Sequence, residues 1–265
     1  MIKTVALSFF IYLFGSFSNA QNSPDGSVIK VLSFNIYHGE TMDGSYDLDK
    51  IAKVILSANP DFVSLQEVDF KTERNEGEDL VVELACRTGM IPLFGKAMNQ
   101  DSGEYGNGIL SKSTFIKSRI LPLPFTEGRE PRSALEISAE ISSGDTISFI
   151  ATHLDYPLDY NGDRIMQVKK INEEFLQNIY PTILAGDLND VPGSEAINIL
   201  EEFWLSAYDK SSPKPTFPSK NPERKIDYVM ASPINKWKIL DRKILCDSIA
   251  SDHCAYFVTL KLMTD

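Results

Sequence analysis

Residues 182–190 read TILAGDLND, an apolar run that leads directly into polar side chains. Thr182 to Ala185 predicts a short buried strand. In extended backbone, residues two apart share a face, so Asp187 and Asn189 would point to the same side. Ends of buried strands are rigid platforms on which a preorganised site is best held. The stretch therefore predicts a functional edge on a sheet.

The same pattern recurs along the chain. A polar residue that ends one strand is usually a turn former or a helix cap. A repeated arrangement of this kind instead predicts one shared site. Asn35 follows the apolar run 31–34, Glu67 follows 62–66, His153 follows 147–152, and Asp227 follows Ile226. Asp252 and His253 precede a further strand.

Hydrophobic periodicity predicts many strands and a few helices. Helices are expected at 48–55 with Asp47 as the N-terminal cap, at 79–87, at 163–179 and at 194–200. Strands are expected at 28–35, 62–65, 108–110, 115–121, 134–141, 146–152, 182–185, 226–230, 237–245 and 256–262. Hairpins and helical crossovers both occur in this order. The mixture predicts two packed, largely antiparallel sheets flanked by helices, an α+β arrangement.

The first 20 residues have the features of a signal peptide. Lys3 is followed by a short apolar run at 5–14, and small residues end at Ala20, where cleavage is expected. The run is too short to span a bilayer. A non-cleaved anchor is the alternative. We expect one domain at 21–265, secreted or periplasmic, monomeric, and with no stable membrane insertion after cleavage.

Composition limits the partners. The net charge of −11 repels nucleic-acid phosphates and anionic membranes at long range, without excluding a local basic site. Three cysteines, Cys86, Cys246 and Cys254, leave at least one thiol unpaired. A disulfide is possible in an oxidising compartment, but their spacing favours buried, reduced side chains.

Seven motifs together resemble the endonuclease/exonuclease/phosphatase superfamily, whose fold is that of DNase I. No single motif is specific, but they occur in the superfamily's order over essentially all of residues 21–265. The resemblance implies a four-layer α/β/β/α sandwich. The motifs are SFNIYHG (33–39), LQEVD (65–69), YGNGILS (105–111), ATHLDY (151–156), GDLND (186–190), KIDYVM (225–230) and SDHCAYF (251–257).

The resemblance also implies a metal centre. Glu67 matches the principal metal ligand of the superfamily, Asp252 matches a direct or water-mediated ligand, and Asn35 matches the residue that supports them. Hydrolysis of a phosphate ester needs neutralised phosphoryl oxygens, an aligned water and a stabilised leaving oxygen. Mg²⁺ or Mn²⁺ prefers oxygen ligands and needs few carboxylates. One or two such ions are expected.

The resemblance assigns the other polar residues to the reaction. Asp187 would position or deprotonate water, and Asn189 would hold a phosphate oxygen or a second metal. His253 would lie beside the scissile phosphate, with Asp227 accepting its other ring N–H and favouring the cation. His153 would donate to the non-bridging oxygens. Whether Asp187 or His253 is the general base stays open.

Further positions are candidates for the pocket wall. Tyr105 and Asn107 are expected to line it. Arg132 would contact phosphate or form a surface ion pair. The proline-rich segment 212–218 would be a wall or a stiff connector. Four residues after His153 are candidates for shaping the pocket: Asp155, Tyr156, Asp163 and Arg164.

The expected function is a secreted, metal-dependent hydrolase of a phosphodiester or phosphomonoester. A secreted nuclease is the alternative, although the acidic charge and the absence of a basic run disfavour tight binding of nucleic acid. A non-catalytic binding module is a third class, but the catalytic positions are intact. No G-x-S-x-G, Walker A or dinucleotide motif occurs.

Overall fold

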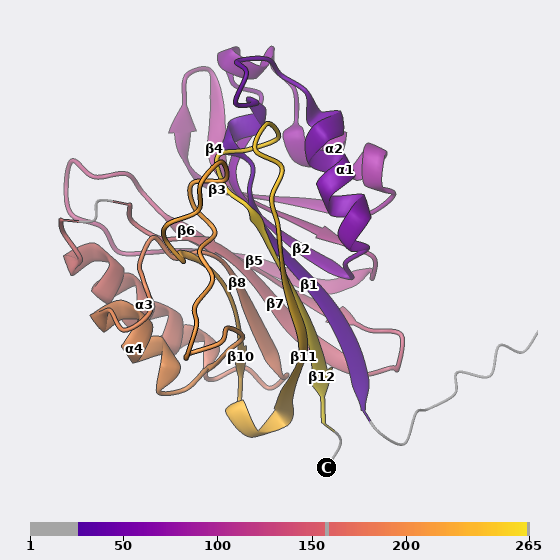
Figure 1. Cartoon of the computed structure of the whole chain (residues 1–265), viewed down its shortest axis with the longest axis vertical. Coiled ribbons are helices and arrows are strands. Elements are labelled where there is room, and N and C mark those ends of the chain that lie inside the picture. Colours follow the sequence, from indigo (N-terminus) through magenta and orange to yellow (C-terminus); the bar gives the residue numbers. More distant parts are fainter. Residues whose placement is uncertain (1–25, 157–158, 264–265) are drawn as a thin grey trace, which may run out of the picture.

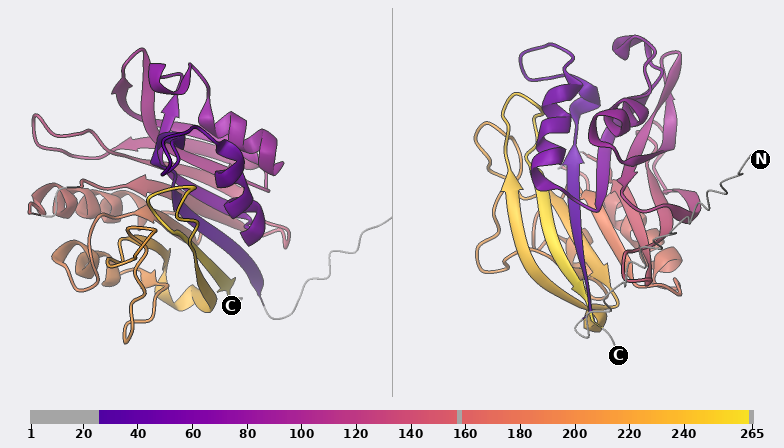
Figure 2. Two further views of the ribbon diagram at one scale, coloured as in Figure 1. Left: turned by 45° about the horizontal axis from the view of Figure 1, so that its top comes forward. Right: turned by 90° about the vertical axis from the view of Figure 1, so that its right-hand side faces the viewer.

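The computed structural model describes residues 26–156 and 159–263, in which two six-stranded sheets pack face to face (Figures 1 and 2). The predicted signal peptide at 1–20 lies outside these residues. The first sheet runs in the order β11 (Trp237–Leu245), β12 (Ala255–Leu262), β1 (Ser27–Asn35), β2 (Phe62–Phe70), β4 (Gly103–Ser111) and β3 (Ile91–Gln100). The second runs in the order β5 (Phe115–Pro122), β6 (Ser133–Glu140), β7 (Thr146–His153), β8 (Thr182–Asp187), β10 (Asp227–Ser232) and β9 (Leu205–Ser206).

Each sheet is antiparallel except for one parallel pair. These pairs are β1 with β2 and β7 with β8. A parallel pair needs a crossover connection, usually a helix. The crossovers contain α1 (Leu48–Ala58) and α3 (Gly162–Phe175). Each pair therefore presents two strand ends at the same edge of its sheet.

Helices cover the outer faces of both sheets, which confirms the four-layer sandwich (Figure 1). Helices α1 and α2 (Leu80–Thr88) pack on the first sheet, where Ile51 and Leu84 join Leu65 in one buried cluster. Helices α3 and α4 (Glu195–Glu201) lie against the second sheet. No helix in the described part of the chain is both long and apolar enough to cross a membrane.

The inner faces of the two sheets form the central core. Phe62 on β2 and Phe149 on β7 are fully buried, and their ring centroids lie 5.2 Å apart across the interface. Tightly packed aromatic side chains of this kind resist displacement. The strand ends of both sheets are therefore held in a fixed relation at one end of the sandwich.

Most predicted elements are present, and Asp47 caps α1 by accepting the backbone N–H of Asp49 at 3.2 Å. The predicted helix 163–179 is wrong at its end. Helix α3 stops at Phe175, whose carbonyl accepts from Asn178 at 3.2 Å in a turn. Ile179 is 86% exposed, so it does not continue the apolar stripe.

The sequence did not predict β3, and it predicted β4 only from residue 108. Strand β3 lies at a sheet edge and carries Pro92 and Gly95, both of which weaken a strand pattern. The packing of the two sheets explains the glycine at position 95, because a Cβ there would lie 2.9 Å from the side chain of Leu135 on the facing sheet.

The preference for unpaired, buried cysteines was wrong, whereas the alternative of one disulfide is confirmed. Cys246, directly after β11, and Cys254, before β12, form a disulfide with 4.3 Å between their Cα atoms. Cys86 on α2 is free and exposed rather than buried. The strands β11 and β12 are antiparallel neighbours, and this pairing brings residues eight apart in sequence into reach.

Candidate active site

Strand register places three of the predicted residues side by side on the second sheet. His153 ends β7 and pairs with Asp187 at the end of the parallel strand β8. Asp187 in turn pairs with Asp227, the first residue of the antiparallel strand β10. All three residues are buried. The sheet therefore converts three separate strand ends into one row of functional groups.

The first sheet contributes Asn35 and Glu67. Asn35 ends β1, and Glu67 follows its partner residue Gln66 on β2. Glu67 has a φ of +56°, within a register shift between Leu65 and Val68. A β-bulge re-aims a side chain, and a positive φ is uncommon for a residue other than glycine. The irregularity thus turns Glu67 out of the regular alternation of β2.

Asn35 connects the two halves of the site. Its Nδ2 lies 3.0 Å from Glu67 Oε1 and 3.3 Å from Asp187 Oδ2. The backbone carbonyl of Asn35 accepts from the Ser251 hydroxyl at 2.7 Å, and that hydroxyl also accepts the backbone N–H of His253 at 3.1 Å. One buried amide residue therefore joins the second sheet to the segment that carries His253.

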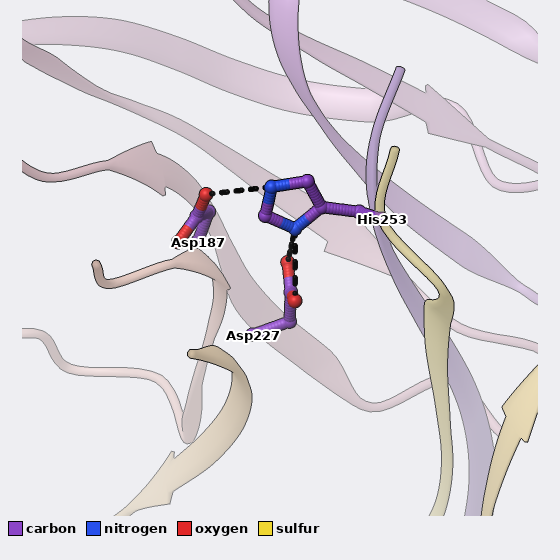
Figure 3. A group of neighbouring side chains, drawn as sticks. All are labelled: Asp187, Asp227 and His253. Carbon is purple, nitrogen blue, oxygen red and sulfur yellow. Dashed lines mark hydrogen bonds and ion pairs between the residues drawn. The ribbon is translucent and has the colours of Figure 1, made fainter. Parts of the chain in front are cut away.

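His253 lies between two carboxylates (Figure 3). Its Nδ1 is 3.1 Å from Asp227 Oδ2, and its Nε2 is 3.6 Å from Asp187 Oδ2. Burial lowers the pKa of His253, but the charges of Asp227 and Asp187 outweigh this effect and raise it to about 10. A pKa in this range favours the imidazolium form at neutral pH.

The pKa of Asp187 results from a different balance of burial and charge. Burial raises the pKa of its carboxyl, and although the nearby His253 charge opposes this, the pKa reaches about 7. The backbone N–H of Asn189 donates to Asp187 Oδ1 at 2.9 Å and fixes the carboxyl orientation. A carboxylate with a pKa near neutrality is suited to general-base chemistry.

His153 contacts the buried Arg132. The guanidinium Nη1 lies 3.0 Å from His153 Nδ1, and since arginine can only donate, Nδ1 accepts. Burial, followed by the charge of Arg132, lowers the pKa of His153 well below its usual value. The other ring nitrogen, Nε2, lies 2.9 Å from the Asn189 amide nitrogen and 3.6 Å from Asp187 Oδ2. Arg132 is only 4% exposed and forms an ion pair with Glu130 Oε1 at 3.0 Å, so the expected ion pair is present, but in the pocket wall rather than on the open surface.

Glu67 and Asp252 are the two carboxylates at the other side of the site. Burial opposes ionisation of Glu67, but contacts from His38 and Asn35 and the charge of His253 outweigh it and lower its pKa to about 2. Burial, and then the charge of Glu67, raise the pKa of Asp252. Two neighbouring carboxylates with an amide behind them fit a hard divalent cation.

The group Asp187, Asp227 and His253 is also compact enough to hold a metal ion. However, both ring nitrogens of His253 already face carboxylates. A histidine ligates metal only as the neutral base, and the raised pKa of His253 disfavours that form. The group of Glu67 and Asp252 is therefore the better match for a cation.

These side chains surround one pocket of about 380 Å³. Of the predicted site residues, Asn35 and Asp227 lie behind the wall as hydrogen-bond partners of Glu67 and His253. Tyr105, Tyr156 and Arg132 are part of the wall. The other lining residues are Glu67, Glu130, His153, Asp187, Asn189, Phe217, Arg224, Ile226, Asp252 and His253.

Four candidates serve the scaffold instead. The Asn107 amide is buried and donates to the Ser133 carbonyl at 2.9 Å. The remaining three fix the loops that follow β7 and β8. Asp155 accepts from Arg129 at 3.1 Å, Asp163 accepts from the Thr126 hydroxyl at 2.6 Å, and Arg164 Nε donates to Asp190 at 3.1 Å.

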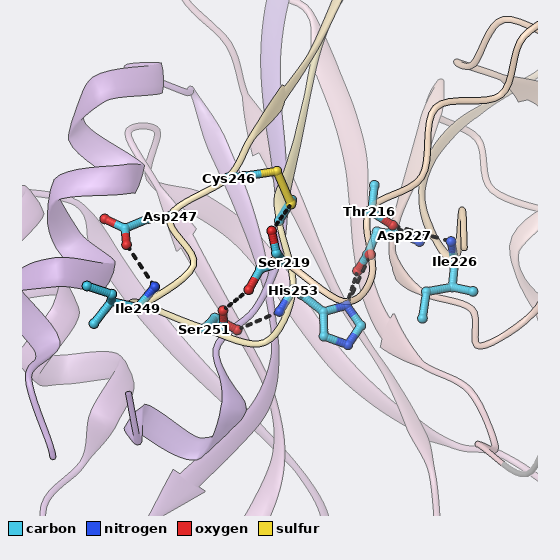
Figure 4. The surroundings of a disulfide bond; sticks show 10 residues. Thr216, Ser219, Ile226, Asp227, Cys246, Asp247, Ile249, Ser251 and His253 are labelled. Carbon is cyan, nitrogen blue, oxygen red and sulfur yellow. Dashed lines mark hydrogen bonds and ion pairs between the residues drawn. A yellow bond between two sulfur atoms is a disulfide. The ribbon is translucent and has the colours of Figure 1, made fainter. Parts of the chain in front are cut away.

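The proline-rich segment forms part of the wall. The Thr216 hydroxyl lies 3.3 Å from the backbone nitrogens of Ile226 and Asp227 (Figure 4). The Phe217 ring centroid lies 4.7 Å from that of His253, and the Arg224 guanidinium lies 4.8 Å from the Phe217 ring centroid. The segment is therefore a wall rather than a simple connector.

Sequence reasoning gave no role to His38, Glu130 or Arg224. His38 Nδ1 lies 3.8 Å from Glu67 Oε2, in a backbone conformation with φ of +45°. It stands inside the motif at 33–39, which was the available signal. The other two reach the pocket from loops, where no periodicity marks them.

The solved structures most informative for comparison share this fold. An endonuclease/exonuclease/phosphatase protein from Beutenbergia cavernae is 25% identical, with a TM-score of 0.75 over 89% of this chain and 72% of its own. The human Nocturnin catalytic domain is 19% identical (TM-score 0.70, 89% and 95% covered). A mannosyl-6-phosphatase from Bacteroides thetaiotaomicron is 16% identical (TM-score 0.66, 88% and 99% covered).

No curated protein matches the sequence. The sequence profile of the endonuclease/exonuclease/phosphatase family, by contrast, matches residues 32–253. This range includes every residue of the pocket described above, from Glu67 to His253. The chain belongs to the endonuclease/exonuclease/phosphatase family.

Proposed function

We propose that this protein is an exported, metal-dependent phosphoesterase that hydrolyses a small phosphodiester or phosphomonoester by in-line attack of water. Members of its family are hydrolases that act on phosphate esters. The observation that carries the proposal is the contact of His253 with both Asp227 and Asp187 inside the pocket that Glu67 and Asp252 also line. A proton acceptor, a protonated donor and two carboxylates suited to bind a cation therefore meet at the same pocket.

Asp187 is the general base in this proposal. With its pKa at about 7, it is substantially ionised at neutral pH and still basic enough to accept a proton from water. His253 stays protonated and donates toward the phosphoryl group or the leaving oxygen, with Asp227 holding the charged ring. This division follows because, near pH 7, a pKa of about 7 lets Asp187 accept a proton, whereas a pKa of about 10 keeps His253 protonated.

His153 and Asn189 hold the phosphoryl oxygens. Arg132 Nη1 lies 3.0 Å from His153 Nδ1, which leaves Nε2 as the ring nitrogen on the Asn189 side of the pocket. The Asn189 amide nitrogen lies 2.9 Å from that nitrogen and donates to the Leu154 carbonyl at 3.0 Å. Both groups are buried, and buried donors act more strongly on developing charge than exposed donors do.

Glu67 and Asp252 would hold Mg²⁺ or Mn²⁺, with Asn35 orienting Glu67. The bound cation would supply charge neutralisation at the phosphoryl and leaving oxygens. Glu67 remains ionised over the whole physiological range because of its depressed pKa, so it is ready to bind. Whether one or two ions bind is a question for metal titration.

A substrate panel tests the proposal. Bis(p-nitrophenyl) phosphate, p-nitrophenyl phosphate, a sugar phosphate and supercoiled DNA would be incubated with the protein in EDTA and after addition of Mg²⁺ or Mn²⁺. We expect hydrolysis that EDTA abolishes, and a loss of about 100-fold or more in kcat for His253→Ala. Cys86→Ser, at an exposed position on α2, is the matched control with unchanged activity.

Two results would contradict it. Hydrolysis that persists in EDTA would remove the cation from the mechanism, and full activity of His253→Ala would remove the imidazolium. Faster nicking of DNA than of any small ester would replace the small-ester substrate with nucleic acid. The net charge of −11 supports the small ester, because the surface repels a long polyanion.

Export is part of the proposal. The disulfide between Cys246 and Cys254 supports it, because disulfides persist in oxidising compartments such as the periplasm or the extracellular medium. The apolar run at 5–14 and the small residues ending at Ala20 support cleavage of a signal peptide. N-terminal sequencing of the protein recovered from its native compartment tests the cleavage position, and size-exclusion chromatography tests the expected monomer.

A further inference from the structure

Lys225 is a buried cation that the proposed mechanism does not use. It is 4% exposed and immediately precedes Ile226 and Asp227. Within residues 26–156 and 159–263, its Nζ has no hydrogen-bond partner. Burying an ammonium group without a hydrogen-bond acceptor is costly, so the surroundings must compensate for the lost hydration.

The compensation comes from tyrosine rings. The Lys225 Nζ lies 4.0 Å from the ring centroid of Tyr228 and 3.9 Å from that of Tyr256. A third ring, Tyr208, is 6.0 Å away and meets Tyr228 edge-on. The face of an aromatic ring is electronegative, and it attracts a desolvated cation more strongly than an exposed one.

The two nearest rings belong to different sheets. Tyr228 is on β10 of the second sheet, one residue after Asp227. Tyr256 is on β12 of the first sheet, three residues after His253. The ammonium group therefore bridges β10, which begins with Asp227, and β12, which begins two residues after His253.

The tyrosine hydroxyls extend this connection. Tyr228 donates to the Asp190 carbonyl at 3.0 Å, in the loop that follows Asp187 and Asn189. Tyr256 donates to the Ala207 carbonyl, next to the third ring, Tyr208. The ring cluster is thus tied to the segment after β8 as well as to β10 and β12.

Charge gives a second link to the site. Burial lowers the pKa of Lys225 to about 7, and the carboxylates of Asp227 and Asp187 oppose this decrease. A methionine would fill a similar volume without the cost of desolvating a charge, and such replacements are often neutral or stabilising. A purely structural role would therefore not require a lysine at this position.

We propose that Lys225 is a positioning residue, which clamps β10 against β12 through the faces of Tyr228 and Tyr256 and thereby sets the Asp227–His253 contact. The clamp rests on the proposed phosphoesterase function only for its kinetic consequence. Lys225 does not line the pocket defined above, so it acts through Asp227 and His253 rather than on the substrate.

Lys225→Met and Lys225→Arg test the clamp. Lys225→Met removes the charge and keeps most of the volume, whereas Lys225→Arg keeps a cation that can stack on a ring. For Lys225→Met we expect a melting temperature equal to or above that of the wild type, a fall in kcat of about tenfold or more, and a KM within about twofold. Lys225→Arg should recover a large part of kcat.

A readout that is independent of substrate accompanies the kinetics. The Nδ1–H proton of His253 would be observed by NMR in the metal-free protein, because its protection from exchange reports the hydrogen bond to Asp227. We expect faster exchange in Lys225→Met and near-wild-type protection in Lys225→Arg. If Lys225→Met does not fold, Tyr256→Leu removes one ring face and leaves the ammonium group in place, and we expect the same fall in kcat and the same faster exchange of the His253 Nδ1–H.

Trp237→Phe is the matched control. The Trp237 side chain on β11 is buried, and its Nε1 donates to the Ser232 carbonyl of β10 at 3.1 Å. It therefore also joins the two sheets, but at the opposite end of β10 from Asp227. We expect a lower melting temperature, with unchanged kcat and an unchanged His253 signal.

The outcomes separate the two proposals. If the wild type hydrolyses phosphate esters and Lys225→Met retains its kcat and the protected Nδ1–H, the clamp is wrong. If kcat falls as far in Lys225→Arg as in Lys225→Met, the positive charge is not the important property and the clamp is again wrong. If the wild type hydrolyses nothing while the His253 signal still responds to Lys225→Met, the clamp stands and the proposed function fails.

Discussion

His253 and Asp187 have opposite protonation requirements in the proposed reaction. Asp187 must be ionised to accept a proton, so the rate should rise with pH through its pKa of about 7. His253 must be protonated, so the rate should fall with pH through its pKa of about 10. We therefore expect a bell-shaped profile of kcat/KM, which reports the free enzyme. A rate that increases steadily through pH 11 would contradict a protonated His253.

Asp227→Asn should move the alkaline limb of that profile. The Asp227 charge is the largest effect that raises the pKa of His253 against burial. Without it, the pKa of His253 should fall by about 1–3 units, as expected for loss of an adjacent opposite charge. The measurement is the pH profile of kcat/KM for both proteins. An alkaline limb that stays near 10 would show that Asp227 does not control the imidazolium.

At the scale of the elements, Gly186 controls the spacing of β7 and β8. A Cβ at Gly186 would lie 2.0 Å from the Thr152 backbone carbonyl oxygen, and a backbone atom cannot rotate away. Gly186→Ala should therefore separate His153 from Asp187, with a loss of about 1–3 kcal/mol of stability and of about 100-fold in kcat. Urea unfolding and steady-state kinetics measure both effects.

Gly193→Ala provides the contrast. Gly193 has a φ of +86° and nothing within 4 Å of the added Cβ. Its strain should cost about 1–2 kcal/mol without changing kcat. Equal kinetic losses in the two variants would show that strand spacing is not the cause.

The disulfide is a second element-scale feature, since it joins β11 to the segment that carries His253 (Figure 4). Cys246→Ser removes it through its exposed member and leaves Cys254 as a buried thiol. For so short a loop we expect a loss of about 2–3 kcal/mol in the free energy of unfolding. Thermal unfolding with and without reductant measures it, with Cys86→Ser as the control. Wild-type stability that is insensitive to reductant would contradict this expectation.

At the scale of the whole molecule, the site is divided between the two sheets. Asn35 and Glu67 come from the first sheet, and His153, Asp187 and Asp227 come from the second. His253 lies just before β12 of the first sheet, but its ring contacts the carboxylates of the second sheet. The functional groups therefore meet only when the sheets pack, which couples the site to global folding.

Binding of a divalent cation should consequently stabilise the whole fold. A ligand that binds only the folded state stabilises it by about 2.7 kcal/mol at 100 times its Kd. We expect Mg²⁺ or Mn²⁺ to raise the melting temperature of the EDTA-treated protein, and Glu67→Gln to abolish the increase. The same increase in Glu67→Gln, or an equal effect of K⁺ at matched ionic strength, would place the cation elsewhere.

The sequence alone determined the kind of elements and the residues at their ends. Alternating apolar runs are governed by local backbone geometry, so most strands and the cap at Asp47 could be predicted. The polar residues after buried strands could also be predicted, because their positions follow from strand direction. The resemblance carried by seven motifs then supplied the four-layer fold and the expected roles.

Only the tertiary structure decided which strand ends meet. Strand pairing joins residues far apart in sequence, and β3 is held by contacts such as Gly95 with Leu135 that leave no local pattern. The disulfide depends on the register of β11 and β12, and the opposite protonation of Asp187 and His253 depends on their burial beside each other. Lys225 likewise reads as an ordinary charged residue until two sheets place tyrosine rings around it. These effects depend on residues that lie far apart in the sequence, so no local sequence pattern predicts them.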